Sequence, residues 1–406
     1  MTLGPGALAN LRHLDAEHQN FDEHINWLIL EEEVLAALNL YGLLSTSRWV
    51  HGPNMKSRQN MEQLLALPQA QAHTLERLRG LLGLMSDYES ADDMRMAREH
   101  LDAAEQIARE LNNHHGLLRA LLAQANNRAF SGDAFEAERY LDEINAIAMN
   151  DNLPWVVALE NYLRAYICFE RGDLDTALEL MRQTLKVAIE SDSLFIETRA
   201  RAELGYYLLH FNRLEEAEQM CLWANRQFTE MGDFQALPIS LTDLAEISLL
   251  RGNTQEARER AERGQMLARR TGSMRGIAAT SQSLARIACV EANWTTAKSY
   301  LHEAMHWNVR CNIPEVAIRC LEDYAKVELA TESPAFAAWC LGAVDGLLQS
   351  RGNVRSGLQQ SEYLDLVERV KHVLDDEDWS ANYDAAKELS VEQILSEVRS
   401  RETARQ

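Results

Sequence analysis

The chain has 406 residues, of which 46% are hydrophobic and 25% charged, a composition typical of a globular protein with ample apolar side chains for a core. Its formal net charge of -22 opposes direct binding to nucleic acid or to an anionic membrane surface. No stretch approaches the roughly 20 apolar residues of a membrane helix, and the first residues lack the pattern of a secretory signal. Six scattered cysteines without a Cys-X-X-Cys pair are typical of buried, reduced thiols. We therefore expect a cytoplasmic protein.

Residues 1–75 are predicted to form a helical segment that contains a degenerate first repeat. That repeat is centred on Ser57, which lies 40 residues before the first member of a regular series of alanines. Glycine and proline occur only 19 and 7 times, which favours long helices with short connections over a sheet-rich fold.

Residues 76–352 are predicted to form an array of helical hairpins with a 40-residue period. Seven alanines recur at this spacing, and small residues stand twelve positions before most of them. These alanines are Ala97, Ala137, Ala177, Ala217, Ala257, Ala297 and Ala337. Residues that tolerate a positive φ angle stand 15 positions after each alanine and, in most units, five positions before it, so each unit divides into two helices. Aspartate, asparagine or serine stands four positions before most of the alanines, which indicates an N-cap.

Residues 353–406 are predicted to form a C-terminal helical cap. The acidic run at 375–378 is typical of a helix start or a solvated turn, because it lacks the ligand spacing and the glycine of a cation-binding loop. This segment is acidic and contains no recognisable helix-turn-helix, so it does not resemble a DNA-binding module.

The repeated columns resemble the tetratricopeptide repeat, whose usual unit of about 34 residues is shorter. The longer unit resembles the sensor region of bacterial signal-transduction ATPases and of LuxR-type transcriptional regulators related to the maltose-regulon activator. Residues 8–29 resemble the segment that joins the ATPase module to the repeats in those proteins, and residues 337–353 followed by 361–395 resemble the end of their arrays. The resemblance implies an all-α, right-handed superhelical solenoid of tetratricopeptide-like hairpins.

The phosphate-binding loop GxxxxGK[ST] of those ATPases is absent from the sequence. We therefore expect the chain to keep only the sensor and partner-binding part, either as a separate protein or as a piece of a longer regulator.

One catalytic pattern matches by letter, the HExxH of zinc proteases at residues 302–306. It would use His302 and His306 as zinc ligands and Glu303 as general base. No third ligand is marked, and helical periodicity places both histidines on the outer face, where solvated side chains are ordinary. We expect no enzyme activity, no metal and no cofactor.

In tetratricopeptide arrays the first helix of each pair lines a concave face, through positions 18, 15, 11 and 8 before the alanine. The resemblance implies a binding groove formed by Arg119, Asn126, Tyr162, Tyr166, Arg199, Tyr206, Glu246, Gln282, Arg286, Arg319, Glu322 and Lys326. Rings in the N-terminal half and charges in the C-terminal half suit a peptide with one apolar and one charged end. Alternatively, Tyr162, Tyr166 and Phe169 pack on neighbouring helices.

These observations predict a non-catalytic scaffold or sensor in bacterial signalling or transcription regulation. Its groove would recognise a peptide, a protein segment or a small ligand, without direct contact to nucleic acid or membrane. The alternative is a structural adaptor that holds two proteins through its convex face and its termini. The ligand, the pathway and the oligomeric state stay open at this point.

Overall fold

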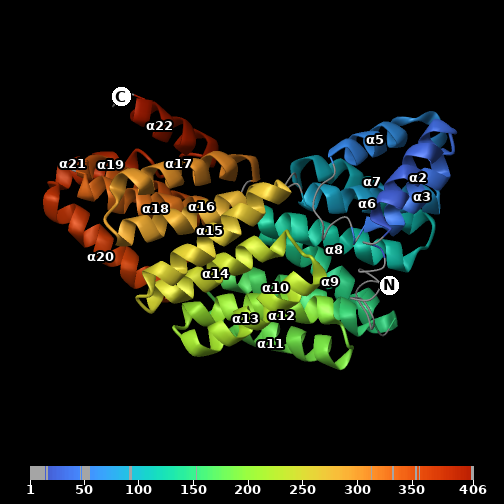
Figure 1. Ribbon diagram of the computed structural model, residues 1–406, viewed down its shortest axis with the longest axis horizontal. Coiled ribbons are helices and arrows are strands. Elements are labelled where there is room, and N and C mark those ends of the chain that lie inside the picture. The colour runs from blue at the N-terminus through green and yellow to red at the C-terminus, as the bar shows by residue number, and fades with distance from the viewer. Residues whose placement is uncertain are drawn as a thin grey trace.

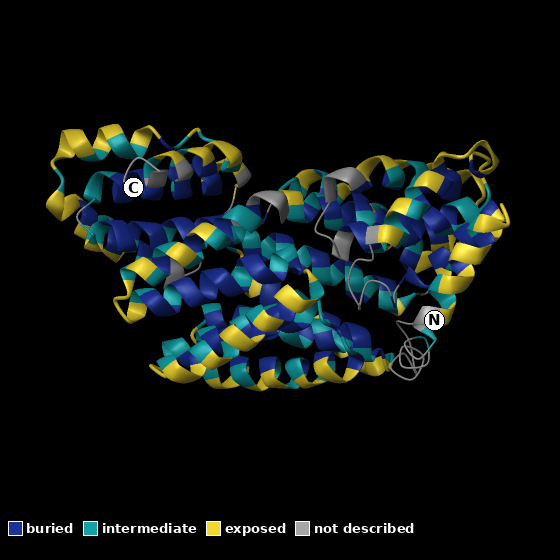
Figure 2. Ribbon diagram, turned by 45° about the horizontal axis from the view of Figure 1, so that its top comes forward, coloured by how far each residue is buried: buried dark blue, intermediate teal, exposed yellow. Residues whose placement is uncertain are grey.

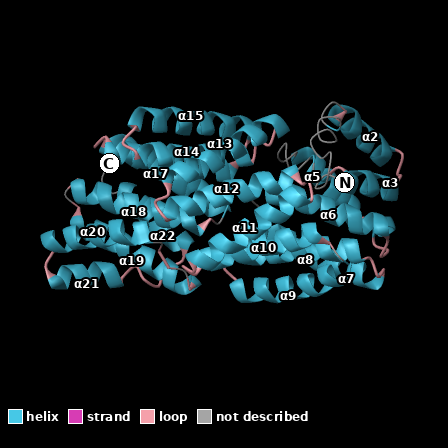
Figure 3. Ribbon diagram, turned by 90° about the horizontal axis from the view of Figure 1, so that it is seen from below, coloured by secondary structure: helices cyan, strands magenta, loops and turns pink. Residues whose placement is uncertain are grey.

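The structure, a computed structural model, describes residues 14, 17–45, 47, 55–90, 94–151, 153–311, 313–331, 333–352, 354–355 and 357–403. Every regular element in these ranges is a helix, as Figure 3 shows, so the all-α solenoid prediction is confirmed. Within the same ranges, no helix combines the length and the hydropathy needed to cross a bilayer.

The N-terminal end of the array consists of α2 (His18–Leu30), α3 (Val34–Leu43), α5 (Met55–Ala66) and a short 3-10 helix, η1 (Pro68–Ala70). In Figure 1 these helices, in blue, form one end of the molecule. Helix α3 crosses α6 (Leu75–Ser90) closely, because two glycines meet there: a Cβ atom on Gly83 would lie 2.9 Å from the Cα atom of Gly42.

The repeat array alternates first helices, with even labels, and second helices, with odd labels. After α6 the helices are α7 (Met94–Glu110), α8 (His114–Ser131), α9 (Ala134–Asp151), α10 (Pro154–Glu170), α11 (Leu174–Glu190), α12 (Leu194–His210), α13 (Leu214–Met231), α14 (Ala236–Leu250), α15 (Thr254–Thr271), α16 (Met274–Val290), α17 (Trp294–Cys311), α18 (Pro314–Ala330) and α19 (Pro334–Arg351). The chain continues through α20 (Gly357–Val373), α21 (Asp376–Asp384) and α22 (Val391–Thr403) at the opposite end of Figure 1.

The repeated columns determine where the helices cross and where they end. All seven alanines of the 40-residue series have 0% exposed surface, as expected for positions where two backbones approach. A positive φ angle occurs in both predicted turn columns, at Gly132, Gly172, Asn212, Gly252, Asn112, Asp192, Gly232, Gly272 and Gly352. Two further members of the second column, Asn152 and Asn312, lie outside the described residues.

The N-cap column is confirmed in part. The side chain of Asp173 accepts a hydrogen bond from the amide of Thr176 at 3.2 Å, and Asn293 accepts one from Thr296 at 3.3 Å. Asn253 and Ser333 also precede helices but make no side-chain cap bond. Asp133 makes the same bond with the amide of Glu136 at 3.3 Å, so three of the described aspartate, asparagine and serine members of the column act as side-chain caps.

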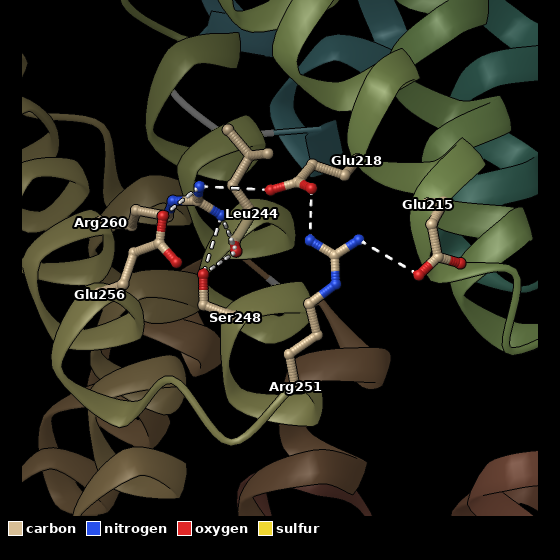
Figure 4. A network of polar contacts seen from close by, with 7 residues as sticks. All are labelled: Glu215, Glu218, Leu244, Ser248, Arg251, Glu256 and Arg260. Carbon is tan, nitrogen blue, oxygen red and sulfur yellow. Dashed lines mark hydrogen bonds and ion pairs between the residues drawn. The ribbon is translucent and has the colours of Figure 1, made fainter.

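Consecutive units are joined by buried apolar faces and by ion pairs at their outer turns. Figure 2 shows the buried residues facing neighbouring helices and the exposed ones on the outer surfaces. In Figure 4, Arg251 at the end of α14 pairs with Glu218 and Glu215 of α13. In the same figure, Arg260 of α15 pairs with Glu218 at 3.4 Å and donates to the Leu244 carbonyl at 2.7 Å. This network ties α13, α14 and α15 together, and its charges are satisfied within the array.

Candidate functional site on the concave face

The predicted groove residues lie on the first helices of consecutive units, from α8 to α18. All of them are half-buried except Gln282, which has 3% exposed surface. Half-burial of polar side chains on one face is the arrangement expected where helices line a narrow concavity. The contacts of these residues divide the face into an N-terminal end, an aromatic middle and a charged C-terminal end.

Arg119 and Asn126 form the N-terminal end, on α8. The Arg119 guanidinium donates to the Ser45 hydroxyl at 3.0 Å, and Ser45 follows α3. Arg119 therefore points towards the N-terminal helices.

The aromatic middle is formed by α10 and α12. The Tyr162 hydroxyl donates to Glu203 at 2.9 Å, between these two neighbouring first helices. The ring centroid of Tyr206 lies 5.5 Å from that of Phe169 and 4.8 Å from that of His210. These aromatic spacings are those of packed ring pairs, so the middle of the face is a preformed aromatic surface with a carboxylate at its edge.

Tyr166 and Arg199 make contacts that differ from this pattern. The Tyr166 ring packs on Phe130 with a centroid distance of 4.5 Å, and its hydroxyl donates to Glu315 of α18 at 3.0 Å. Arg199 pairs with Asp233 at 2.7 Å, in the turn before α14. Arg199 therefore holds α12 to that turn, because its partner carboxylate is fully buried and needs the pairing.

The charged C-terminal end is centred on Arg286 of α16. Its guanidinium lies 3.1 Å from Glu246 of α14 and 3.1 Å from Glu362 of α20. Arg319 of α18 lies 3.9 Å from Glu246. A guanidinium with a carboxylate on either side is already neutralised, so a ligand at Arg286 must compete with two internal acids.

The remaining predicted residues, Gln282, Glu322 and Lys326, lie beside this centre. Gln282 and Lys326 both donate to Asp323, at 2.9 and 3.0 Å. Glu322 accepts from Arg355 at 3.2 Å. The buried Gln282 amide is therefore an internal link between α16 and α18 and is not presented to solvent.

Sequence reasoning missed several residues of this face, among them Glu203, Asp243 and His210. Glu203 and Asp243 lie 14 positions before their alanines, and His210 lies seven before, which continues the predicted positions 18 and 11 by one helical turn. Adding the positions four residues after positions 18 and 11 on each first helix would have included all three residues.

Burial shifts the pKa values of two side chains on this face. The pKa of Asp243 is raised to about 7, because the carboxyl is buried and lies near Glu203 and Glu246, an effect that Arg319 only partly offsets. Burial and the neighbouring Arg319 and Arg286 lower the pKa of His210 to about 3. Near neutral pH, the imidazole is thus uncharged and Asp243 is partly protonated.

The HExxH motif does not bring its residues together as a metal site. Glu303 pairs with Arg269 of α15 and accepts a hydrogen bond from Ser281 at 2.8 Å. In the described part of the chain, no group of three or more histidine, cysteine, aspartate or glutamate side chains is arranged to hold a metal ion. The Glu303 carboxylate instead links α15, α16 and α17.

Comparison with known proteins supports the fold. No protein-family model and no curated protein matches the chain. The structure is similar to the crystal structure of a Rap protein complexed with competence and sporulation factor, with a TM-score of 0.60 and 12% sequence identity. The match covers 90% of this chain and 99% of that one. The chain therefore has a tetratricopeptide-like helical-repeat fold over most of its length.

Proposed function

We propose that this chain is a non-catalytic helical-repeat scaffold that binds a peptide or an extended protein segment on its concave face, as a sensor in bacterial signalling or transcription regulation. The observation that carries the proposal is the concentration of half-buried rings, carboxylates and guanidinium groups on the first helices α10 to α18. Such side chains are costly to leave half-desolvated unless they are paired, and a ligand on this face would supply partners for those that are not.

We expect a ligand to gain most of its binding free energy at the aromatic middle of the face. Tyr206, Phe169 and His210 form a surface of rings, and His210 is uncharged near neutral pH. Next to them Asp243 makes no hydrogen bond or ion pair within the described residues. An apolar side chain of a ligand over these rings, with an N–H donor near Asp243, would satisfy both kinds of group.

The similarity in fold to the Rap protein supports a binding role, because that protein is complexed with competence and sporulation factor. A small-molecule effector would use the same face with fewer contacts. The two ligand classes are separable by size: a protein segment is captured from a cell extract by immobilised protein, whereas an effector is found in a dialysable fraction.

The test begins with capture of a partner and continues with titration against variants of the face. Tyr206→Ala should weaken binding by about 2–4 kcal/mol, the scale of an aromatic hot spot, with helicity unchanged. Tyr300→Ala is the matched control, because Tyr300 is also half-buried but lies on a second helix, α17. Equal binding by the parent and by Tyr206→Ala would mean that the partner binds elsewhere.

Arg286 tests the charged end. Arg286→Glu would place a third carboxylate between Glu246 and Glu362, so the neutral change Arg286→Gln is the better probe. We expect it to reduce the association rate of an acidic ligand and the dependence of that rate on salt.

The adaptor alternative is favoured by one observation, the exposed apolar side chains of the second helices. Phe135 of α9 and Met266 of α15 have 76% and 61% exposed surface, respectively. A partner on the convex face would cover such residues. Phe135→Ser and Met266→Ser should then abolish capture, while Tyr206→Ala leaves it intact, and the groove proposal predicts the opposite pattern.

A further inference from the structure

Side chains of the array touch across the concave side between units that are distant in sequence. The Arg275 guanidinium of α16 lies 5.2 Å from the ring centroid of Phe130 of α8. The Tyr166 hydroxyl of α10 donates to Glu315 of α18 at 3.0 Å. The Val354 amide, just before α20, donates to the carbonyl of Glu170, the last residue of α10, at 3.1 Å.

Two of these contacts join the end of one first helix to the start of the first helix four units later, since α8 faces α16 and α10 faces α18. The third joins the end of α10 to the segment before α20, five units later. Helices α12 and α20, also four units apart, approach each other in the same way. The array therefore winds so tightly that successive turns touch, and we call the contacts of Phe130, Tyr166 and Glu170 with Arg275, Glu315 and Val354 the seam.

The seam is polar and lies at the edge of the buried interior. The three largest hydrophobic clusters of the described residues follow the order of the chain. One extends from α2 to α10, one from α10 to α14 and one from α16 to α22, and none of them joins α10 to α18. Tyr166 and Glu315 are half-buried, and Val354 has 54% exposed surface. Parting the seam therefore exposes almost no apolar core, and water can replace each of its hydrogen bonds.

The seam also encloses the face described above. Tyr206, Asp243 and Arg319 interact electrostatically with one another although they come from α12, α14 and α18. Side chains of both turns thus face the same narrow space. Separation of the turns at the seam would widen that space.

We propose that the seam is a gate: it holds the concave face closed in the ligand-free protein, and the turns part there to admit a ligand. The role of a gate rests on the proposed groove function, but the separation of the turns at the seam can be measured without any ligand. The ligand gains its contacts with both turns in exchange for the contacts that the seam loses.

Cysteine reactivity provides the measurement. Cys289 of α16 lies on the concave face near Arg286, Asp323 and Lys326, and burial raises the pKa of its thiol to about 12. Cys168 of α10 is also half-buried; it stands between Tyr166 and Glu170 in the chain, but its thiol lies near Asp173 and near Glu138 of the second helix α9. The rate of alkylation by N-ethylmaleimide at each thiol is read by peptide mass mapping of the full chain. Cys289 lies at the end of α16 opposite Arg275 and faces residues of α18, so the ratio of the Cys289 rate to the Cys168 rate reports how far separation of the turns exposes the concave face.

Tyr166→Phe removes the cross-turn hydrogen bond and keeps the ring on Phe130. We expect it to raise the Cys289-to-Cys168 ratio several-fold, and Tyr166→Phe with Arg275→Gln to raise it further. Small-angle scattering of the double variant should show a larger radius of gyration. Tyr162→Phe is the matched control, because it removes a tyrosine–glutamate bond of similar length from the same helix but within one turn.

Two results would overturn the proposal. One is an unchanged ratio in the double variant. The other is an equal rise in Tyr162→Phe, which would mean a general loosening. Cys320 and Cys340, both with 0% exposed surface, should stay unreactive and thereby exclude unfolding as the cause. Failure of the groove proposal would instead appear as Tyr206→Ala binding like the parent, a result that leaves the cysteine data untouched.

Discussion

The raised pKa of Asp243 gives a quantitative test of how far the side chains of the concave face are desolvated. Its carboxyl is half-buried on α14 near Glu203 and Glu246, and its pKa in the folded protein is raised to about 7. The unfolded chain has an aspartate pKa of about 3.9, so the folded state holds the proton more tightly. The stabilisation linked to that proton is complete below the unfolded value and is lost as the pH rises through the folded value. The loss is about 1.4 kcal/mol per pH unit between the two values.

Asp243→Asn replaces the carboxyl with a neutral group of the same shape. Between pH 5 and pH 8, the free energy of unfolding of the parent should fall by about 2–3 kcal/mol relative to the variant. Guanidinium unfolding followed by circular dichroism, together with hydrogen exchange of the α12 and α14 amides, measures this difference. Asp175→Asn, on the exposed first turn of α11, is the control and should follow the parent. Parallel pH curves for the parent and Asp243→Asn would refute the assignment of a desolvated carboxyl.

Three further predictions concern the array. Ala217→Leu should cost about 1–3 kcal/mol, because the backbone of α12 at Gly205 already approaches Ala217 and Cys221, and hydrogen exchange should rise only around that junction. Arg260→Met should destabilise the α13–α15 junction by about 1–3 kcal/mol through loss of its charged hydrogen bonds, whereas Arg182→Met on the exposed surface of α11 should not. Millimolar Mg-ATP should leave the melting temperature unchanged; a bound nucleotide at a hundredfold excess over Kd would add about 2.7 kcal/mol, so a shift of several degrees would reveal an unrecognised site.

The gate and the groove constrain each other energetically. A ligand that binds only the open state has its apparent affinity reduced by the fraction of molecules that are open. Variants that weaken the seam should therefore bind a groove ligand more tightly, through a higher association rate, than the parent does. The charged end of the face imposes a second cost, because Arg286 must leave Glu246 or Glu362 to meet a new partner.

Local chemistry made the architecture readable from the sequence. An alanine where two helices cross and a glycine or asparagine at a positive φ angle are favoured by short-range sterics, and these requirements recur in most of the described units. The column of Ala97 to Ala337 therefore located the helices, and the face of each first helix followed from the helical period. The same reasoning placed Tyr162, Tyr206 and Arg286 on one surface. It left out Glu203 and Asp243 because the predicted inward positions did not include the one 14 residues before each alanine.

Tertiary structure decided what those side chains meet. Tyr166 and Glu315 are 149 residues apart, and their hydrogen bond depends on small rotations between successive units that add up over four repeats. No local signal in the sequence encodes that sum, because each rotation arises from the packing of whole helix pairs. The seam, the pairing of Arg286 with both Glu246 and Glu362, and the proton held by Asp243 all depend on this curvature. The sequence determined the repeating unit and its inward face, and the accumulated twist determined how closely opposite sides of that face approach.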